Sequence, residues 1–210
     1  MLALILFSSA IAYFLGSINT SIIVSKLMGK SDIRNFGSGN AGVTNTLRVM
    51  GKGAALVVVL GDFLKGALAV LIARYAFSFF GVTGNEMIAQ YFAATFVILG
   101  HIYPVFFEFR GGKGIMTSIA TVFFLDWEIA VILLLIFIAI FVTTRYVSLG
   151  SCVSSFMYPI LVYMFNHEDR FFVGTSLFVA ALAIFKHRSN IKRLIQGNES
   201  KTYFKKKKTV

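Results

Sequence analysis

Three polar segments interrupt this hydrophobic chain, and each carries residue types that bind phosphate. In the first, residues 31–53, the glycines permit positive φ angles and a close approach of the backbone to a ligand. Arg34 and Arg48 supply guanidinium groups whose paired donors fit phosphate oxygens. If a helix begins at Asn40 or Thr44, the free N–H groups of its first turn would add to an anion site. A Gly/Asn turn that only caps a helix is the structural alternative. The other candidates here are Ser38, Gly39 and Asn45.

The second segment is the string RGGKG at Arg110–Gly114. Glycines around a lysine are typical of a loop whose N–H groups surround an anion beside an ammonium group. The spacing is not that of a Walker loop, and a glycine turn followed by a topology-setting lysine explains the string about as well. Upstream, His101 and Pro104 lie inside an apolar run, where such residues are costly, although a lone histidine is more often a packing residue. The candidates are Gly111, Gly112, Lys113 and Gly114.

The third segment, Lys186–Lys201, predicts a short amphipathic helix lying along the membrane surface. Its histidine, His187, titrates near neutrality in an ordinary environment and could take part in proton transfer, and Asn190 lies three residues further on. A simple basic anchor is the alternative interpretation. We expect Glu199 to pair with a neighbouring cation rather than to catalyse. Arg188 is a further candidate cation, and Ser148, in a short polar turn, is a further candidate donor.

The elements that must position these residues are membrane helices. Of 210 residues, 57% are hydrophobic and 14% are charged, and the mean hydropathy is +0.79, whereas soluble domains have about 25% charged residues. A soluble domain and a disordered chain are therefore excluded, and we predict one all-α membrane domain over residues 1–210. The seven predicted spans are Leu2–Leu27, Ala54–Phe80, Met87–Phe107, Ile115–Leu125, Ile129–Thr144, Ser151–Phe165 and Phe171–Phe185. The last four are short, and Ile115–Leu125 could instead be re-entrant or buried by its neighbours.

The distribution of charge predicts the orientation of these spans. Basic residues gather in residues 26–53, 108–114, 145–150 and 186–210, whereas acidic residues dominate the opposite connections. By the positive-inside rule the N-terminus is outside, the C-terminus is cytoplasmic, and the three polar segments share the cytoplasmic face. Residues 186–210 would form a basic interfacial segment and tail. We expect the tail to attract anionic lipid headgroups and not nucleic acid, because no aromatic-interleaved basic module accompanies it.

Other classes of site have little support in the sequence. The single cysteine, Cys152, excludes an intrachain disulfide, and the three histidines are too far apart to predict a metal site. No cofactor is expected. Asp62 and Lys65, three residues apart inside a predicted span, are either a structural pair or a wall of the site.

A transporter for an organic phosphate could use the same cations, but we find no internal repeat and the cations gather at one face. A structural scaffold would leave the polar loops unexplained.

Three ordered motifs carry a resemblance to a known family. The strings GSGNAGVTNTLRVMG, GHIYPVFFEFRGGKG and HRSNIKRLIQGNESK, with DFLKG in the second span, resemble the bacterial membrane glycerol-3-phosphate acyltransferases that use acyl phosphate. The resemblance runs from Gly16 to Lys201. Most members of that family have Pro, Ala, Phe and Lys where this chain has Ala41, Val43, Tyr103 and Arg110. These differences are conservative and remove no proposed ligand.

The resemblance implies a reaction in which acyl phosphate donates its acyl group to the 1-hydroxyl of sn-glycerol 3-phosphate. The products would be lysophosphatidic acid and phosphate, in the first acylation of phospholipid synthesis at the cytoplasmic face of a bacterial plasma (inner) membrane. The acyl chain would lie in a groove between spans. An acyl-phosphate-forming enzyme that docks on the basic tail is left open as a partner.

The same resemblance implies roles for individual residues. Ser38 and Arg48 would bind glycerol phosphate, and Asn190 would bind the acyl phosphate. Lys113 and the glycine loop would bind in the phosphate region that the two substrates share. His187 is a candidate proton acceptor, with a substrate phosphate as the alternative, and Glu199 would be structural. The implied catalytic residues are Ser38, Arg48, Lys113, His187 and Asn190, and the implied phosphate-binding residues are Gly39, Asn40, Thr44, Asn45, Gly111, Gly112, Gly114 and Ser148.

Overall fold

The computed structural model describes residues 1–82, 86–166 and 168–203, and in these ranges it is all-helical, as predicted. The basic tail predicted to meet lipid headgroups, residues 204–210, lies outside the described residues. Two 3-10 turns, η1 (Ile33–Asn35) and η2 (Val105–Phe107), lie in the polar loops. The α-helices are α1 (Leu2–Ser17), α2 (Thr20–Leu27), α3 (Val43–Met50), α4 (Lys52–Phe79), α5 (Glu86–Ile102), α6 (Ile115–Leu125), α7 (Trp127–Thr144), α8 (Val147–Asn166), α9 (Arg170–Lys186) and α10 (Arg188–Ile195).

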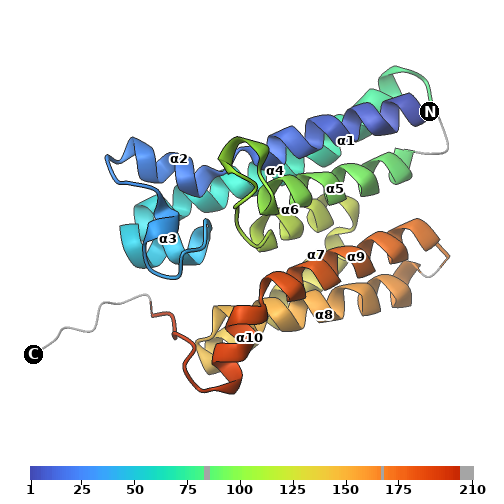
Figure 1. Cartoon of the computed structure of the whole chain (residues 1–210). Helices are drawn as coiled ribbons and strands as arrows, with labels where there is room; N and C mark the ends of the chain where they lie inside the picture. The colour runs from blue at the N-terminus through green and yellow to red at the C-terminus, as the bar shows by residue number, and fades with distance from the viewer. Residues whose placement is uncertain (83–85, 167, 204–210) are drawn as a thin grey trace, which may run out of the picture.

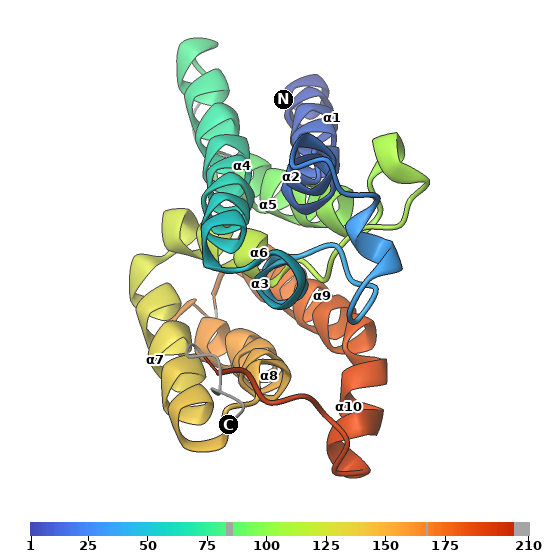
Figure 2. The ribbon, with the colours of Figure 1, turned by 90° about the vertical axis from the view of Figure 1, so that its left-hand side faces the viewer.

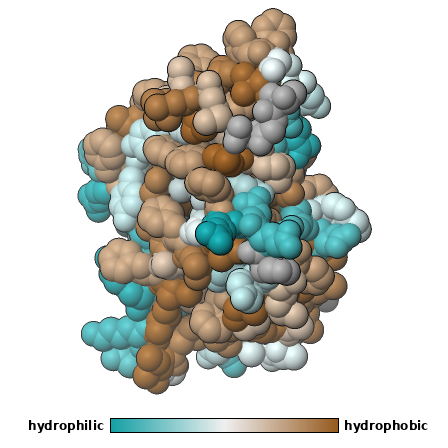
Figure 3. All heavy atoms as spheres, turned by 90° about the vertical axis from the view of Figure 1, so that its right-hand side faces the viewer, coloured by the Kyte–Doolittle hydropathy of each residue, from teal (hydrophilic) through white to brown (hydrophobic). Residues whose placement is uncertain are grey.

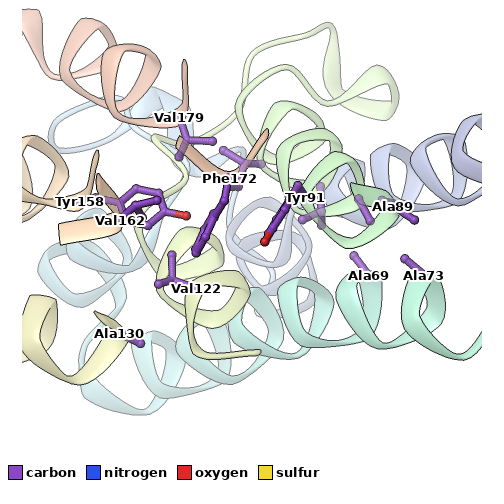
Figure 4. Close-up of a cluster of buried hydrophobic side chains, with 14 of the residues drawn as sticks. Ala69, Ala73, Ala89, Tyr91, Val122, Ala130, Tyr158, Val162, Phe172 and Val179 are labelled. Atoms are coloured by element: carbon purple, nitrogen blue, oxygen red, sulfur yellow. The ribbon is translucent and has the colours of Figure 1, made fainter. Parts of the chain in front are cut away.

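The helices form two groups joined by α6 (Figure 1). In the first group α1 and α4 pack against α5, and α2 and α3 pack near one end of α4. In the second group α7 and α9 pack on either side of α8. The groups also meet directly, because the rings of Tyr91 in α5 and Phe172 in α9 stack with centroids 4.7 Å apart (Figure 4). Aromatic stacking and α6 therefore hold the two halves of the bundle together.

All seven predicted apolar segments are helical, but they differ in length. Within the described residues, five stretches are long and apolar enough to cross a membrane, and α9 with α10 makes a sixth if this pair, bent by 57°, is counted as one span. Helix α6 has 11 residues, too few to cross about 30 Å of hydrocarbon by itself. It is packed against α4, α5 and α7, which gives its ends protein neighbours within the bundle. The orientation of the termini stays a prediction.

The first span is broken in its middle. Helix α1 ends at Ser17 and α2 begins at Thr20, and the Asn19 side chain caps α2 by accepting from the N–H of Ile22 at 3.1 Å. The Lys65 ammonium donates to the carbonyls of Gly16 at 3.2 Å and Ile18 at 3.0 Å. Backbone groups at a break within a membrane need such partners. Lys65 therefore has a structural role, one of the two that the sequence left open.

Two glycines allow α1 and α5 to cross at close range. A Cβ on Gly100 would meet the carbonyl oxygen of Tyr13 and the Cα of Gly16, and a Cβ on Gly16 would meet the carbonyl of Val97. Small residues that let helix backbones approach are typical of membrane helix interfaces. The crossing places the end of α5, and so the start of the glycine loop, beside the break after α1.

This crossing predicts the effect of a single methyl group. Gly100→Ala forces the two backbones apart, and overpacking of this kind costs about 1–3 kcal/mol. We expect a lower thermal unfolding midpoint in detergent than for the unchanged protein. The matched control is Gly174→Ala in α9, where an added Cβ meets no atom within 4 Å. Equal midpoints for the two variants would contradict the close crossing.

Candidate active site

A cavity of about 700 Å³ brings the three polar segments together. It lies at the end of the molecule where α3 and α10 lie, and Figure 2 looks onto this end. Its wall is built from the loop before α3, from α3, the glycine loop, the start of α6, the turn between α7 and α8, and α10 with the segment that follows it. The predicted site residues in its lining are Ser38, Asn40, Thr44, Asn45, Arg48, Lys113, Gly114, Ser148, His187, Asn190 and Glu199.

Asn45 shapes the first loop and has no free donor for a ligand, in contrast to the sequence-based interpretation. Its Oδ1 accepts from the N–H of Ser38 at 2.8 Å, and its Nδ2 donates to the carbonyls of Phe36 at 3.0 Å and Ile33 at 3.3 Å. An amide has two N–H donors, and both are used here. Gly37 has a φ of 59°, and a Cβ there would collide with Asn45. The loop therefore presents Ser38 to the cavity on a backbone held by Asn45.

Arg34 is a tie between loops rather than a phosphate ligand. Its guanidinium donates to Asp32, with Nη2 2.8 Å from Oδ2, and to the carbonyls of Phe107 at 2.8 Å and Arg110 at 3.0 Å. It does not line the cavity, and neither does Arg188, whose guanidinium lies over the ring of Phe185. Arg48 is an exposed residue of α3 and lines the cavity. Of the arginines predicted to bind phosphate, it is therefore the one whose guanidinium faces the site.

The glycine loop departs from the predicted N–H nest. The N–H groups of Gly111 and Gly112 donate to the carbonyls of Ile102 and His101, both at 3.1 Å, so they are not free for an anion. These two glycines, like Gly39, lie outside the lining. A Cβ on Gly112 would collide with the His101 ring and the Ala41 carbonyl. Gly111 and Gly112 therefore allow the loop to pack closely against the end of α5.

The free backbone N–H donors of the glycine loop belong to the next two residues, Lys113 and Gly114. Among the described residues, the N–H groups of Lys113 and Gly114 have no hydrogen-bond acceptor, and Gly114 has a φ of 83° that leads directly into α6. The N-terminus of α6 therefore faces the same cavity as the ammonium of Lys113. Free N–H groups and the helix dipole at such a terminus favour an anion.

Glu199 joins the far wall of the cavity. One carboxylate oxygen accepts from Ser148 at 2.7 Å and from the Asn190 amide at 2.6 Å, and the other accepts from Arg193 at 2.7 Å. Ser148 was predicted to bind phosphate, but its hydroxyl proton is committed to Glu199. Asn190 also accepts a hydrogen bond from the Lys113 ammonium. This network fixes Lys113, which belongs to one helix group, against α10 of the other.

The cavity lowers the pKa of Lys113. Burial lowers the pKa of its ammonium to about 8, while Glu199 opposes the shift. The group is therefore still mostly charged at neutral pH but close to its titration range.

His187 is neutral at physiological pH. Its Nδ1 lies 2.8 Å from the carbonyl oxygen of Ala183, so Nδ1 carries the proton and Nε2 presents a lone pair. Burial, with a further contribution from the Lys113 charge, lowers the pKa of His187 to about 4. The side chain is buried but lines the cavity. It can accept a hydrogen bond from a hydroxyl group, but it is a weak base.

Three ionisable residues in the lining were not expected there or were left open. Arg193 follows Asn190 by three residues, and this helical spacing could have placed it on the same face. Asp62 and His101 also line the cavity, from the sides of α4 and α5. Among the described residues, no group of three His, Cys, Asp or Glu side chains could hold a metal ion.

An apolar groove continues the cavity into the helix bundle. A second cavity of about 130 Å³ shares Ile115, Met116, Phe137 and Ser151 with the first. It runs between α6, α7, α8 and α9 as far as Tyr158, and its lining is almost wholly apolar. A polar, cationic chamber is thus continuous with a groove that suits a hydrocarbon chain.

Known proteins match this chain over nearly its whole length. The family model for glycerol-3-phosphate acyltransferase matches residues 6–197. The glycerol-3-phosphate acyltransferase of Thermoanaerobacter pseudethanolicus is 47% identical over 194 residues, which cover 92% of this chain and 93% of that protein.

Solved structures match as well. The crystal structure of PlsY, an integral membrane glycerol 3-phosphate acyltransferase, in its glycerol 3-phosphate form has a TM-score of 0.85 and 37% identity, and the match covers 95% of this chain and 96% of that one. Its lysophosphatidic acid form has a TM-score of 0.82 and 35% identity, with the same coverage. With its apolar helices and its cationic cavity, this chain therefore belongs to the glycerol-3-phosphate acyltransferase family, as an integral membrane protein.

Proposed function

We propose that the protein transfers a fatty acyl group from acyl phosphate to the 1-hydroxyl of sn-glycerol 3-phosphate. The observation that carries this proposal is the continuity of the cationic cavity with the apolar groove. A donor with a phosphate head and an acyl tail fits both compartments at once. The existence of PlsY in a glycerol 3-phosphate form and a lysophosphatidic acid form supports the acceptor and the product.

The chemistry of the lining supports an activated donor. Among the described residues, no serine hydroxyl in the lining donates to a histidine, as activation of a serine nucleophile would require. Acyl phosphate already has a good leaving group, so direct attack by the acceptor hydroxyl needs no covalent enzyme intermediate. The protein then has to align two substrates and neutralise their charges.

In the mechanism we propose, Arg48 and Ser38 bind the phosphate of glycerol 3-phosphate. Lys113 and the N-terminus of α6 bind the phosphate of the donor, and Asn190 orients the Lys113 ammonium. His187 accepts a hydrogen bond from the 1-hydroxyl and orients it toward the acyl carbonyl. The new ester bond forms from that oxygen, the carbonyl–phosphate bond breaks, and the hydroxyl proton leaves on the released phosphate. The low pKa of His187 favours phosphate as the final acceptor.

The placement of charge supports a cytoplasmic site. Helices α3 and α10, which contain Arg48 and Arg188, lie at the cavity end, whereas α5 and α9 begin on the opposite side with Glu86 and the capping Asp169 (Figure 1). That opposite side is mainly hydrophobic with a band of polar side chains (Figure 3). By the positive-inside rule the cavity then opens to the cytoplasm of a bacterial cell, where the reaction would begin phospholipid synthesis.

The first test is donor specificity. Purified protein in detergent is given glycerol 3-phosphate together with either acyl phosphate or acyl-CoA, both carrying the same acyl group. Lysophosphatidic acid and released phosphate are then measured. We expect product with acyl phosphate alone, formed in equal amounts with phosphate. Equal rates with acyl-CoA would contradict the proposed donor. Uptake of labelled glycerol 3-phosphate into proteoliposomes without turnover would favour a transporter instead.

The second test removes one cation at a time. Lys113→Ala and Arg48→Ala each take away a positive group facing a phosphate, and we expect kcat/KM to fall by about 10²–10³-fold, as for other preorganised donors. The folded state should persist in size-exclusion chromatography. Arg188→Ala is the matched control, because Arg188 lies outside the cavity lining. An unchanged kcat/KM in either cavity variant would remove that residue from the site.

The third test follows the pKa of Lys113. The ammonium is protonated below pH 8 and loses its charge above it, so phosphate binding should weaken as the pH rises through about 8. We expect kcat/KM for acyl phosphate to fall on this alkaline side. Lys113→Arg, whose guanidinium stays charged, should retain a flat profile up to pH 9 at a lower rate. A fall at the same pH in Lys113→Arg would assign the titration to another group.

A further inference from the structure

Three buried ionisable side chains lie behind the glycine loop and have no part in the mechanism above. The Lys65 ammonium lies 2.9 Å from Asp62 Oδ1 and 2.8 Å from His101 Nδ1. Each residue is at most 5% exposed. Ionisable groups at such depth in a membrane protein are costly and usually serve a function.

The contacts of Nδ1 determine the tautomer of His101. An ammonium group has only donors, so at 2.8 Å from Lys65 the Nδ1 atom must present its lone pair. The Asp62 carboxylate lies further from Nδ1, at 3.6 Å, and does not receive a proton from it. The proton of the neutral ring is therefore on Nε2, and His101 is a hydrogen-bond donor at that atom.

Nε2 faces the glycine loop beside the cavity. The ring lines the cavity, and a Cβ built on Gly112 would collide with Nε2. In the described part of the chain, no hydrogen bond pairs Nε2 with an acceptor, and Nε2 does not donate to the Ala41 carbonyl close to Gly112. Gly112 directly precedes Lys113, whose N–H is also free. A donor on a buried ring that lines the cavity thus lies close to the place where two backbone donors lack a partner.

We propose that His101 Nε2–H donates a hydrogen bond to a substrate phosphate held at Lys113 and the start of α6. This role rests on the proposed function, because it adds a third kind of donor to the same anion site. Asp62 and Lys65 are positioning residues: Lys65 holds the tautomer by donating to Nδ1, and Asp62 neutralises Lys65. Second partners that fix the tautomer of a functional histidine are a common arrangement.

The fold does not need His101 to satisfy Lys65. The three donors of the Lys65 ammonium point to the carbonyls of Gly16 and Ile18 and to His101 Nδ1, and Asp62 lies beside them as the ion-pair partner at 2.9 Å. When the histidine is removed, the third donor can turn to Asp62. Variants at position 101 should therefore fold, which makes the proposal testable.

Two substitutions separate the donor role from a packing role. In His101→Gln the side-chain amide reaches the position of Nε2, so the donor toward the phosphate is retained. In His101→Asn the amide reaches only the position of Nδ1, so the contact with Lys65 is retained and the donor is lost. The matched control is Gln90→Asn, a buried polar change at the other end of α5.

The readouts are the KM values for acyl phosphate and glycerol 3-phosphate, and the binding of inorganic phosphate by calorimetry. We expect His101→Asn to weaken phosphate binding and to lower kcat/KM by about 10- to 100-fold, the effect of losing a hydrogen bond to a charged group. His101→Gln should keep most of both. A raised KM for acyl phosphate identifies the donor phosphate as the ligand, and a raised KM for glycerol 3-phosphate identifies the acceptor phosphate.

Two outcomes would overturn the proposal. One is wild-type kinetics and phosphate binding in His101→Asn. The other is a loss of activity and phosphate binding in both His101→Asn and His101→Gln that is no larger than their fall in thermal midpoint explains. Gln90→Asn supplies the reference for how much activity a given fall in midpoint removes. If the unchanged protein binds phosphate but transfers no acyl group, the proposed function fails, and the binding comparison still tests His101.

Discussion

The buried charge of Lys65 is the interaction on which the site depends. An ammonium at this depth must be neutralised and hydrogen-bonded, and its acceptors come from Asp62, from two carbonyls at the break after α1, and from His101. One side chain of α4 thereby holds the end of α1 and the last turn of α5. The glycine loop leaves α5 at this point and returns onto it through the carbonyls of His101 and Ile102.

A carboxylate holds the opposite wall in the same way. Glu199 accepts from Ser148, Asn190 and Arg193, and so ties the start of α8, α10 and the segment after α10 to one another. The two walls belong to different helix groups and meet across the cavity where Lys113 donates to Asn190. The glycerol-3-phosphate acyltransferase fold thus places a polar chamber between two apolar bundles, which is where a substrate with a charged head and a hydrocarbon tail can bind.

Most polar groups around the cavity are occupied by one another, and the groups left over define the chemistry. Asn45, Arg34, Ser148 and the first two glycines of the loop are bound to protein partners. A buried polar group without a partner is costly, so those that remain free in a built cavity are the ones a ligand satisfies. Within the described residues they include Arg48, the side chains of Ser38, Asn40 and Thr44, the N–H groups of Lys113 and Gly114, and the outward nitrogens of His101 and His187.

The sequence by itself determined the class of protein, the helical segments and the three polar stretches that build the cavity, because hydropathy and residue type are local properties. It also indicated Arg48, Lys113, His187 and Asn190, which the cavity includes. Only the tertiary structure decided that Arg34 and Asn45 serve the loops, that Ser148 serves Glu199, and that Asp62 and His101 reach the cavity. A residue type states which hydrogen bonds a side chain can make. Which of them are already taken depends on neighbours distant in the chain, and these meet only when the helices pack.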